Sequence, residues 1–166
     1  MVTANCDSSE RIAFELVELC AKCGLTVGCA ESCTAGLVSS SIADVPGASQ
    51  VLQGGVVSYT EAVKHSMLGV SLETLETVGA VSEKCACEMA AGAREALGCD
   101  IAVSVTGFAG PGGGTADNPV GTVYIGISTK NLLFANRFLF SGERAAVRHA
   151  ACEAALRALL DAVQES

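Results

Sequence analysis

The sequence is poor in aromatic and basic side chains. Tryptophan is absent and aromatic residues make up 4% of the 166 residues. A folded core must therefore be built from small side chains that interdigitate closely. Only 10 lysine and arginine residues stand against 18 aspartate and glutamate residues, which gives a net charge of −8. A surface of that sign repels nucleic acid and anionic lipid, so we expect neither as a partner. One small anionic ligand remains compatible with this charge.

Long apolar runs are missing as well. The longest segments without a charged residue, 45–60 and 101–116, have 16 residues each and are interrupted by glycine and proline. A membrane-spanning helix needs about 20 predominantly apolar residues. Asp7, Glu10 and Arg11 stand where a signal peptide would need its apolar stretch. Half of the residues are nevertheless apolar, which excludes a disordered chain. The sequence predicts one cytoplasmic domain over residues 1–166 that contacts no membrane.

Cysteine, in contrast, is abundant, with nine residues. Cys20 and Cys23 have the spacing of zinc ligands, but Cys85 and Cys87 do not repeat it, and no histidine lies beside either pair. Cys20 and Cys23 also continue the apolar stripe that begins at Ile12. We therefore interpret them as small buried hydrophobic residues and predict no metal site.

Hydrophobic periodicity and capping residues predict helices that alternate with strands. Helices are expected over 8–22, 33–43, 60–68, 71–77, 82–97 and 141–163, and strands over 25–30, 51–59, 101–106, 120–128 and 132–140. The last two strands are close enough to pair as a hairpin. This pattern predicts an α/β fold, a three-layer α/β/α sandwich with a mixed, mostly parallel β-sheet.

The segment ESCTAG at 31–36 occupies a predicted turn from a strand to a helix. A hydroxyl group there is held by a rigid scaffold, and free N–H groups at a helix start stabilise an oxyanion. Ser32 is therefore a candidate nucleophile. Ser32 or Thr34 fits equally well as a simple helix N-cap. Cys33 is an alternative nucleophile, because a helix N-terminus lowers the pKa of a thiol.

A serine nucleophile needs a base, and the segment YTEAVKH at 59–65 offers two. Burial disfavours the charge of a lysine, so a buried Lys64 would carry a pKa closer to neutrality. Tyr59 would be placed to orient that amine. The alternatives are that Lys64 lies on a solvated helix face, or that His65 is the base.

Two further features are typical of ligand contacts. The loop TGFAGPGGGT at 106–115 lacks the ending of a phosphate-binding P-loop, but its glycines permit close approach of backbone N–H groups to a ligand. A flexible connection explains the glycines equally well. Arg144 and Arg148 lie four residues apart, on one face of a helix start that suits a phosphate monoester. The alternative is a pair of solvated arginines.

Together these segments resemble the CinA C-terminal domain family over residues 11–160. The motifs that carry the resemblance occur in the order AESCTAG at 30–36, PGAS at 46–49, GGVVSY at 54–59 with Lys64, GAVSE at 79–83, TGFAGPGG at 106–113 and PVGTV at 119–123. The chain departs from the family at Ala35, where a second glycine is common, and at Phe108, where isoleucine is usual. Both departures bear on substrate preference and leave the proposed catalytic atoms in place.

The resemblance implies an amidohydrolase, because stand-alone members of the family are nicotinamide mononucleotide deamidases that recycle pyridine nucleotides. It implies Ser32 as nucleophile, Lys64 as base and Tyr59 as its helper, with no metal and no cofactor. It also implies a small-molecule nucleotide substrate and a homo-oligomer. The residues expected to contact the substrate are Cys33, Thr34, Gly36, Gly107, Gly110, Gly112, Gly113, Arg144 and Arg148.

In the mechanism that follows from this resemblance, Lys64 removes the proton of Ser32, which attacks the carboxamide carbon. N–H groups around Cys33 and Thr34 would hold the oxyanion, and an arginine would bind the 5′-phosphate. Two alternatives stay open. A non-catalytic nucleotide-binding domain would not need Ser32 and Lys64 together, and a cysteine amidase would use Cys33 instead.

Overall fold

The structure is a computed structural model that describes residues 8–166. Asp7 and the rest of 1–7, at the start of the predicted domain, lie outside the described residues. The elements in chain order are α1 (Ser8–Cys23), β1 (Val27–Glu31), α2 (Leu37–Ala43), the 3-10 helix η1 (Ala48–Gln50), β2 (Leu52–Val57), α3 (Glu61–Leu68), α4 (Leu72–Thr77), α5 (Glu83–Leu97), β3 (Ile101–Gly107), β4 (Thr122–Ser128), β5 (Leu133–Leu139) and α6 (Arg144–Gln164).

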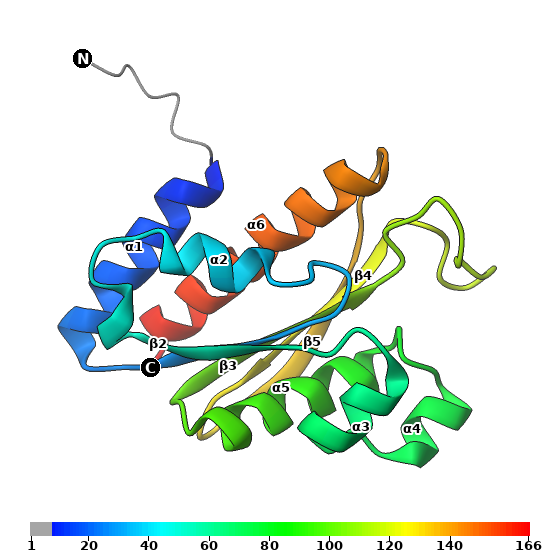
Figure 1. Cartoon of the computed structure of the whole chain (residues 1–166), viewed down its shortest axis with the longest axis horizontal. Helices are drawn as coiled ribbons and strands as arrows, with labels where there is room; N and C mark the ends of the chain where they lie inside the picture. Colours follow the sequence, from blue (N-terminus) through cyan, green and yellow to red (C-terminus); the bar gives the residue numbers. More distant parts are fainter. Residues whose placement is uncertain (1–7) are drawn as a thin grey trace.

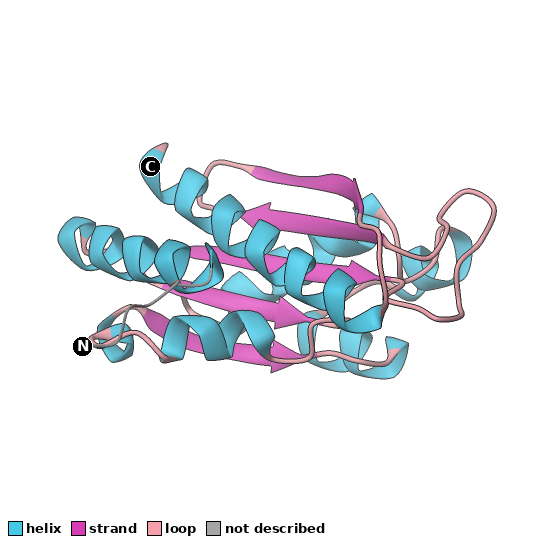
Figure 2. Ribbon diagram, turned by 90° about the horizontal axis from the view of Figure 1, so that it is seen from above, coloured by secondary structure: helices cyan, strands magenta, loops and turns pink. Residues whose placement is uncertain are grey.

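The five strands form one sheet in the order β2-β1-β3-β4-β5. β2, β1 and β3 are parallel, whereas β4 runs antiparallel to β3, and β5 antiparallel to β4. Helices α1, α2 and α6 cover one face, and α3, α4 and α5 cover the other (Figure 1). Seen from above, β5 and β2 form the two edges of the sheet (Figure 2). The predicted three-layer sandwich with a mixed sheet is confirmed.

The core divides between the two faces of the sheet. The larger cluster joins α1 and α6 to the central strands and includes Leu16, Val103 and Leu156, all fully buried. The smaller cluster lies under α5 around Met89 and Ala102. No tryptophan contributes to either, as the composition required.

Two predictions of local structure were wrong. The helix expected from residue 33 begins at Leu37, because Ala35 and Gly36 have φ angles of 51° and 99° that no α-helix contains. Cys23 is exposed, although Cys20 is fully buried, so only the first of the two belongs to the core. Within residues 8–166 no group of three or more metal-binding side chains occurs, and none of the helices there has both the length and the apolar character to span a bilayer.

One glycine sets the distance between α3 and α5. A Cβ atom added to Gly92 would collide with the backbone carbonyl of Leu68, at the end of α3. Backbone atoms cannot move aside as a flexible side chain can, so the close packing of the two helices requires a residue without a side chain. α3 carries Lys64, and Gly92 therefore helps to position the helix that bears the candidate base.

We expect Gly92→Ala to lower the free energy of unfolding by about 1–3 kcal/mol, because overpacking outweighs the gain in helix propensity. Urea denaturation of both proteins measures the change. Gly112→Ala is the matched control, since a Cβ atom there meets nothing within 4 Å. Equal stability of Gly92→Ala and the wild-type protein would contradict the packing argument.

Candidate active site

The side chains of Ser32 and Lys64 meet beyond the ends of two parallel strands. Glu31, the last residue of β1, pairs with Val57 at the end of β2, so the segments that follow both strands leave the sheet side by side. The N–H group of Ser58 donates to the carbonyl of Glu31 at 2.8 Å and holds them together. α3 begins three residues later, which brings Lys64 back over Ser32.

Lys64 Nζ lies 2.9 Å from Ser32 Oγ and donates a second hydrogen bond of 2.7 Å to the carbonyl oxygen of Ser58. Lys64 is 2% exposed and Ser32 is 9% exposed. Both of these hydrogen-bond partners of the amine are neutral. A buried lysine without a carboxylate partner is uncommon, because transfer of an ammonium group from water is costly unless the charge is paired.

Burial accordingly lowers the pKa of Lys64, and electrostatic interactions with Cys85, Cys33 and Glu61 partly offset the effect. A lower pKa increases the fraction of neutral amine near neutral pH. The ammonium form donates to Ser32 Oγ, whereas the neutral amine accepts the hydroxyl proton across the same 2.9 Å contact. The pair has the geometry of a nucleophile and its general base.

The alternative base and the alternative nucleophile are less suited to proton transfer. The ring of His65 makes a 2.8 Å contact through Nδ1 with the carbonyl oxygen of Val70 and does not line the cavity that contains Ser32. Burial raises the pKa of the Cys33 thiol to about 11, the opposite of the predicted lowering. The physical reason is that α2 begins at Leu37, so no helix N-terminus faces Cys33.

The loop after Ser32 is held from one side by the carboxylate of Glu31, which is 1% exposed. One carboxylate oxygen accepts hydrogen bonds from the N–H groups of Gly36 and Val38, at 2.9 and 3.1 Å. The other accepts from the N–H and hydroxyl groups of Ser39, at 2.9 and 2.7 Å. Glu31 thus acts as a cap for α2 from within the preceding strand, a role that the sequence reading did not assign to it.

Arg148, on α6, holds the same loop from the other side. Its guanidinium group donates to the carbonyl oxygens of Cys33 and Thr34, at 2.9 and 2.8 Å. These contacts turn both carbonyl groups toward α6. Among the described residues, the N–H groups of Cys33 and Thr34 have no hydrogen-bond partner in another residue. The loop therefore combines fixed carbonyl groups with two unpaired N–H groups, and of these two residues Cys33 lines the cavity that contains Ser32.

Arg144 lies one helical turn before Arg148 and has different contacts. It donates to the carbonyl oxygen of Gly110, in the glycine-rich loop, and to the hydroxyl group of Tyr59, both at 2.8 Å. Arg144 and Tyr59 are exposed. No hydrogen bond joins Tyr59 to Lys64 among the described residues. Tyr59 is therefore a hydrogen-bond partner of Arg144 and not of the Lys64 amine.

A cavity of about 320 Å³ contains the serine and the lysine. It is lined by Ser32, Cys33, Tyr59, Thr60, Glu61, Lys64, Ala80, Val81, Thr106, Gly107, Ala109 and Arg144. An adjoining hollow shares Ala109 and Arg144 with it and extends along Gly110 and Pro111 toward the start of α6. The cavity and the adjoining hollow together form an elongated site. Ser32 lies in the cavity, and Arg144 lies where the cavity meets the hollow.

Six of the residues predicted to form the site line this cavity, and six do not. Thr34, Gly36, Gly112, Gly113 and Arg148 line neither hollow, and Gly110 lines only the adjoining one. Thr60, Glu61, Ala80, Val81, Thr106 and Ala109 were missed. Ala80, Val81, Thr106 and Ala109 fall inside the motifs GAVSE and TGFAGPGG, so their positions in these motifs were the available signal.

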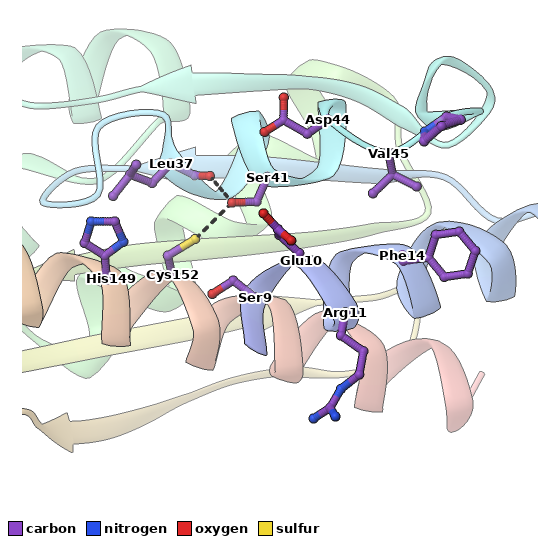
Figure 3. A pocket seen from close by; sticks show the side chains of 11 residues that line it. Ser9, Glu10, Arg11, Phe14, Leu37, Ser41, Asp44, Val45, His149 and Cys152 are labelled. Atoms are coloured by element: carbon purple, nitrogen blue, oxygen red, sulfur yellow. Dashed lines mark hydrogen bonds between the residues drawn. The ribbon is translucent and has the colours of Figure 1, made fainter. Parts of the chain in front are cut away.

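A larger hollow of about 510 Å³ lies between α1, α2 and α6 (Figure 3). Glu10, Arg11 and Asp44 line it together with Ser41, whose hydroxyl group donates to the carbonyl of Leu37 at 2.8 Å and lies 3.6 Å from Cys152 Sγ. His149 also lines it. It holds no serine beside a buried base, so the smaller cavity is the better candidate for catalysis.

The chain is similar to known proteins in sequence and in structure. The family model described as CinA C-terminal domain matches residues 9–163. The nicotinamide-nucleotide amidohydrolase PncC of Enterobacter agglomerans is 48% identical over 143 residues, which cover 86% of this chain and 85% of that protein. A CinA-like protein of Syntrophotalea carbinolica is 44% identical over 146 residues, which are 87% of this chain but only 35% of the longer relative.

Two solved structures are similar over nearly their whole length. The competence/damage inducible protein CihA of Agrobacterium tumefaciens superposes with a TM-score of 0.92 and 37% identity, over 98% of this chain and 99% of that one. A CinA superfamily protein of Klebsiella pneumoniae gives a TM-score of 0.91 and 30% identity, over 95% and 99%.

We expect Lys64 to titrate below the ordinary lysine value of 10.5, because burial disfavours its ammonium form. NMR of lysine labelled at Cε and Nζ measures this, with the other lysines as internal references. Glu61→Gln removes one negative charge that favours the ammonium form, so the pKa of Lys64 should fall further in that variant. Titration of Lys64 together with the other lysines would overturn its assignment as a base.

Proposed function

Because the chain belongs to the CinA C-terminal domain family, we propose that it is a nicotinamide-nucleotide amidohydrolase. Nicotinamide mononucleotide and water would give nicotinate mononucleotide and ammonia, with Ser32 and Lys64 as the reacting pair. The observation that carries the proposal is the 2.9 Å contact between a buried amine and a hydroxyl group beside free N–H groups. The name of the relative from Enterobacter agglomerans supports the substrate class.

In the first half of the reaction, neutral Lys64 takes the proton from Ser32 Oγ, which attacks the carboxamide carbon of the substrate. The negative charge that develops on the carboxamide oxygen is stabilised by the N–H groups of Cys33 and Thr34. Lys64 then returns its proton to the amide nitrogen, the C–N bond breaks, and ammonia leaves. The product of this half is an ester between Ser32 and the nicotinoyl group.

In the second half, Lys64 takes a proton from a water molecule, which attacks the ester carbon. The same N–H groups hold the second oxyanion. The C–O bond to Ser32 breaks, Oγ regains a proton from Lys64, and the product carboxylic acid gives its own proton to solvent water and leaves as nicotinate. Both halves use one base and one oxyanion site, and the site returns to its starting state.

Arg144 is the better of the two arginines for the 5′-phosphate. Its side chain is exposed, it lines both hollows, and its partners are a carbonyl group and a tyrosine hydroxyl group, with no carboxylate. Tyr59 would contact the nucleotide beside Arg144, and Gly107 and Gly110 would approach it through their backbone. The guanidinium group of Arg148 already donates to two carbonyl groups. Arg148 would therefore be a positioning residue that holds the loop of Ser32.

The remaining assignments are part of the same proposal. The described residues would form a single catalytic domain in the cytoplasm that acts on a small nucleotide, uses no metal or other cofactor, and binds no nucleic acid. The reaction would return pyridine nucleotide to synthesis. The protein would act as a homo-oligomer.

The proposal predicts that the wild-type protein releases ammonia from nicotinamide mononucleotide and that a chelator leaves the rate unchanged. Ser32→Ala and Lys64→Met should each lower kcat by about 100-fold or more, because the first removes the nucleophile and the second the general base. Methionine has nearly the volume of lysine, so the buried site stays filled. A coupled ammonia assay measures all three proteins.

Cys33→Ala is the matched control, since it removes the alternative nucleophile next to Ser32 and should keep most of the activity. Loss of activity in Cys33→Ala together with retention in Ser32→Ala would assign the reaction to the thiol. A folded wild-type protein that releases no ammonia would instead favour a nucleotide-binding domain, and calorimetry with the same nucleotide would then detect binding.

The two arginines should separate kinetically. We expect Arg144→Ala to raise KM at least about tenfold with a small change in kcat, because a remote phosphate contact is largely uniform binding. Arg148→Ala should mainly lower kcat, because it releases the loop that carries the oxyanion donors. Steady-state kinetics on both variants makes the comparison, and the reverse pattern would place the phosphate on Arg148.

A further inference from the structure

The cavity that contains Ser32 holds two charges of opposite sign that do not neutralise each other. Its charged lining residues are Glu61, Lys64 and Arg144, and burial disfavours the charge of Lys64. Among residues 8–166, the carboxylate of Glu61 makes no hydrogen bond and no ion pair, and Arg144 donates to a carbonyl oxygen and a hydroxyl group. The carboxylate and the guanidinium group are therefore both available to a ligand.

Glu61 occupies the first turn of α3, directly after the N-cap Thr60. The helix dipole favours a carboxylate there, which accounts for the charge of Glu61 but not for the direction in which it points. Glu61 and Lys64 are three residues apart, so both lie on the face of α3 that lines the cavity. Lys64 is buried and Glu61 is exposed. The base therefore lies deep in the cavity, and the carboxylate lies nearer its opening.

We propose that Glu61 recognises the positive charge of the substrate ring, so that the site selects nucleotides whose base is a pyridinium cation. The inference rests on the proposed function and adds to it the group that binds the base. The nitrogen of a nicotinamide ring carries a formal positive charge when it is bonded to ribose, whereas the ring of free nicotinamide is neutral. The substrate thus has a positive base and a negative phosphate, and Glu61 and Arg144 offer the complementary charges.

The order of the groups along the site supports this assignment. The carboxamide carbon must lie against Ser32 Oγ, which is 2.9 Å from Lys64 Nζ. The phosphate is assigned to Arg144, whose guanidinium group donates to the hydroxyl group of Tyr59, two residues before Glu61. A nucleotide that reaches from Ser32 to Arg144 therefore passes the start of α3, where Glu61 lies.

The spacing of Glu61 and Lys64 fits the size of the ring. Three residues of an α-helix span about 4.5 Å along the axis, which is comparable with one six-membered ring. The ring is bonded directly to the carboxamide, and one ring atom separates its nitrogen from the carbon that bears this group. With the reacting carbon at Ser32, the charged ring therefore lies within reach of the carboxylate of Glu61.

A neutral Lys64 belongs to the same arrangement. An ammonium group at Lys64 would repel a cationic ring bound beside it, whereas the neutral amine does not. The interaction with Glu61 raises the pKa of Lys64, so removal of the Glu61 charge shifts the amine further toward its neutral form. The variant Glu61→Gln therefore keeps a neutral base, and weaker substrate binding in that variant is not caused by protonation of Lys64.

Two ligands that differ in the charge of the ring test the inference. One is nicotinamide mononucleotide, and the other is its benzamide analogue, in which a neutral phenyl ring is bonded to ribose through carbon. Both have the same carboxamide and the same phosphate. Calorimetry on Ser32→Ala protein measures both dissociation constants without turnover. We expect the added substitution Glu61→Gln to weaken binding of nicotinamide mononucleotide about fivefold and to change binding of the analogue less than about twofold.

Glu83→Gln is the matched control, in the same Ser32→Ala protein. Glu83 follows the N-cap Ser82 of α5 as Glu61 follows Thr60, but it does not line the cavity. Its substitution should leave both dissociation constants unchanged. Glu61→Asp keeps the charge and should keep the preference for the cationic ring. Added salt should reduce this preference by screening, and because the phosphate is common to both ligands, its own salt dependence cancels in their ratio.

Equal weakening of both ligands by Glu61→Gln, or no change in either, would overturn the inference. An equal loss of preference in Glu83→Gln would also overturn it, because the effect would then come from the overall charge of the protein. Ammonia release by the wild-type protein beside any of these results removes the role of Glu61 and leaves the proposed function standing. No ammonia release and no binding of either ligand would instead overturn the proposed function, and this inference with it.

Discussion

The proposed chemistry of this domain depends on a lysine amine that is buried beside neutral hydrogen-bond partners. Among residues 8–166, the hydrogen-bond partners of Lys64 are a hydroxyl group and a carbonyl oxygen. Burial therefore disfavours the ammonium form of Lys64. Because that form is destabilised, a larger fraction of the amine is neutral and available as a base. A carboxylate in the place of the Ser58 carbonyl would stabilise the ammonium and remove that base. The neutral character of both hydrogen-bond partners of the Lys64 amine is thus what the proposed mechanism requires.

The second constraint is the delayed start of α2. If the helix began directly after β1, the N–H groups of Cys33 and Thr34 would stay near its axis and the serine would be a simple cap. Instead Ala35 adopts a left-handed conformation at φ 51°, which costs a residue with a Cβ atom about 1–2 kcal/mol. Four hydrogen bonds to the buried Glu31 carboxylate offset this cost. The strained loop at Ala35 and the Glu31 carboxylate that caps α2 therefore depend on each other.

Sequence patterns located the elements that carry the site better than the contacts within it. Strand and helix periodicity placed Ser32, Lys64 and the glycine-rich loop each after the end of a predicted strand, but it did not give the order of these strands in the sheet. The same patterns put Arg144 and Arg148 on one helix face and gave both the same role. Their partners lie 34 to 115 residues away along the chain, in loops whose carbonyl directions no side-chain period encodes. The start of α2 was misjudged for a similar reason, because alanine as a residue type does not predict the positive φ that Ala35 adopts between the contacts of Glu31 and Arg148.

Helix α6 connects the site to the edge of the sheet. Its first residue, Arg144, lines the cavity, its second turn holds the serine loop through Arg148, and its later turns form a groove with β5 that includes Phe134 and Phe138. Only four residues separate the end of β5 from the start of α6. Ser32 follows β1, on the far side of β3 from β5, and Lys64 lies on α3. The chain thus brings Arg144 to the site from one edge of the sheet, and the serine and the lysine from the other half.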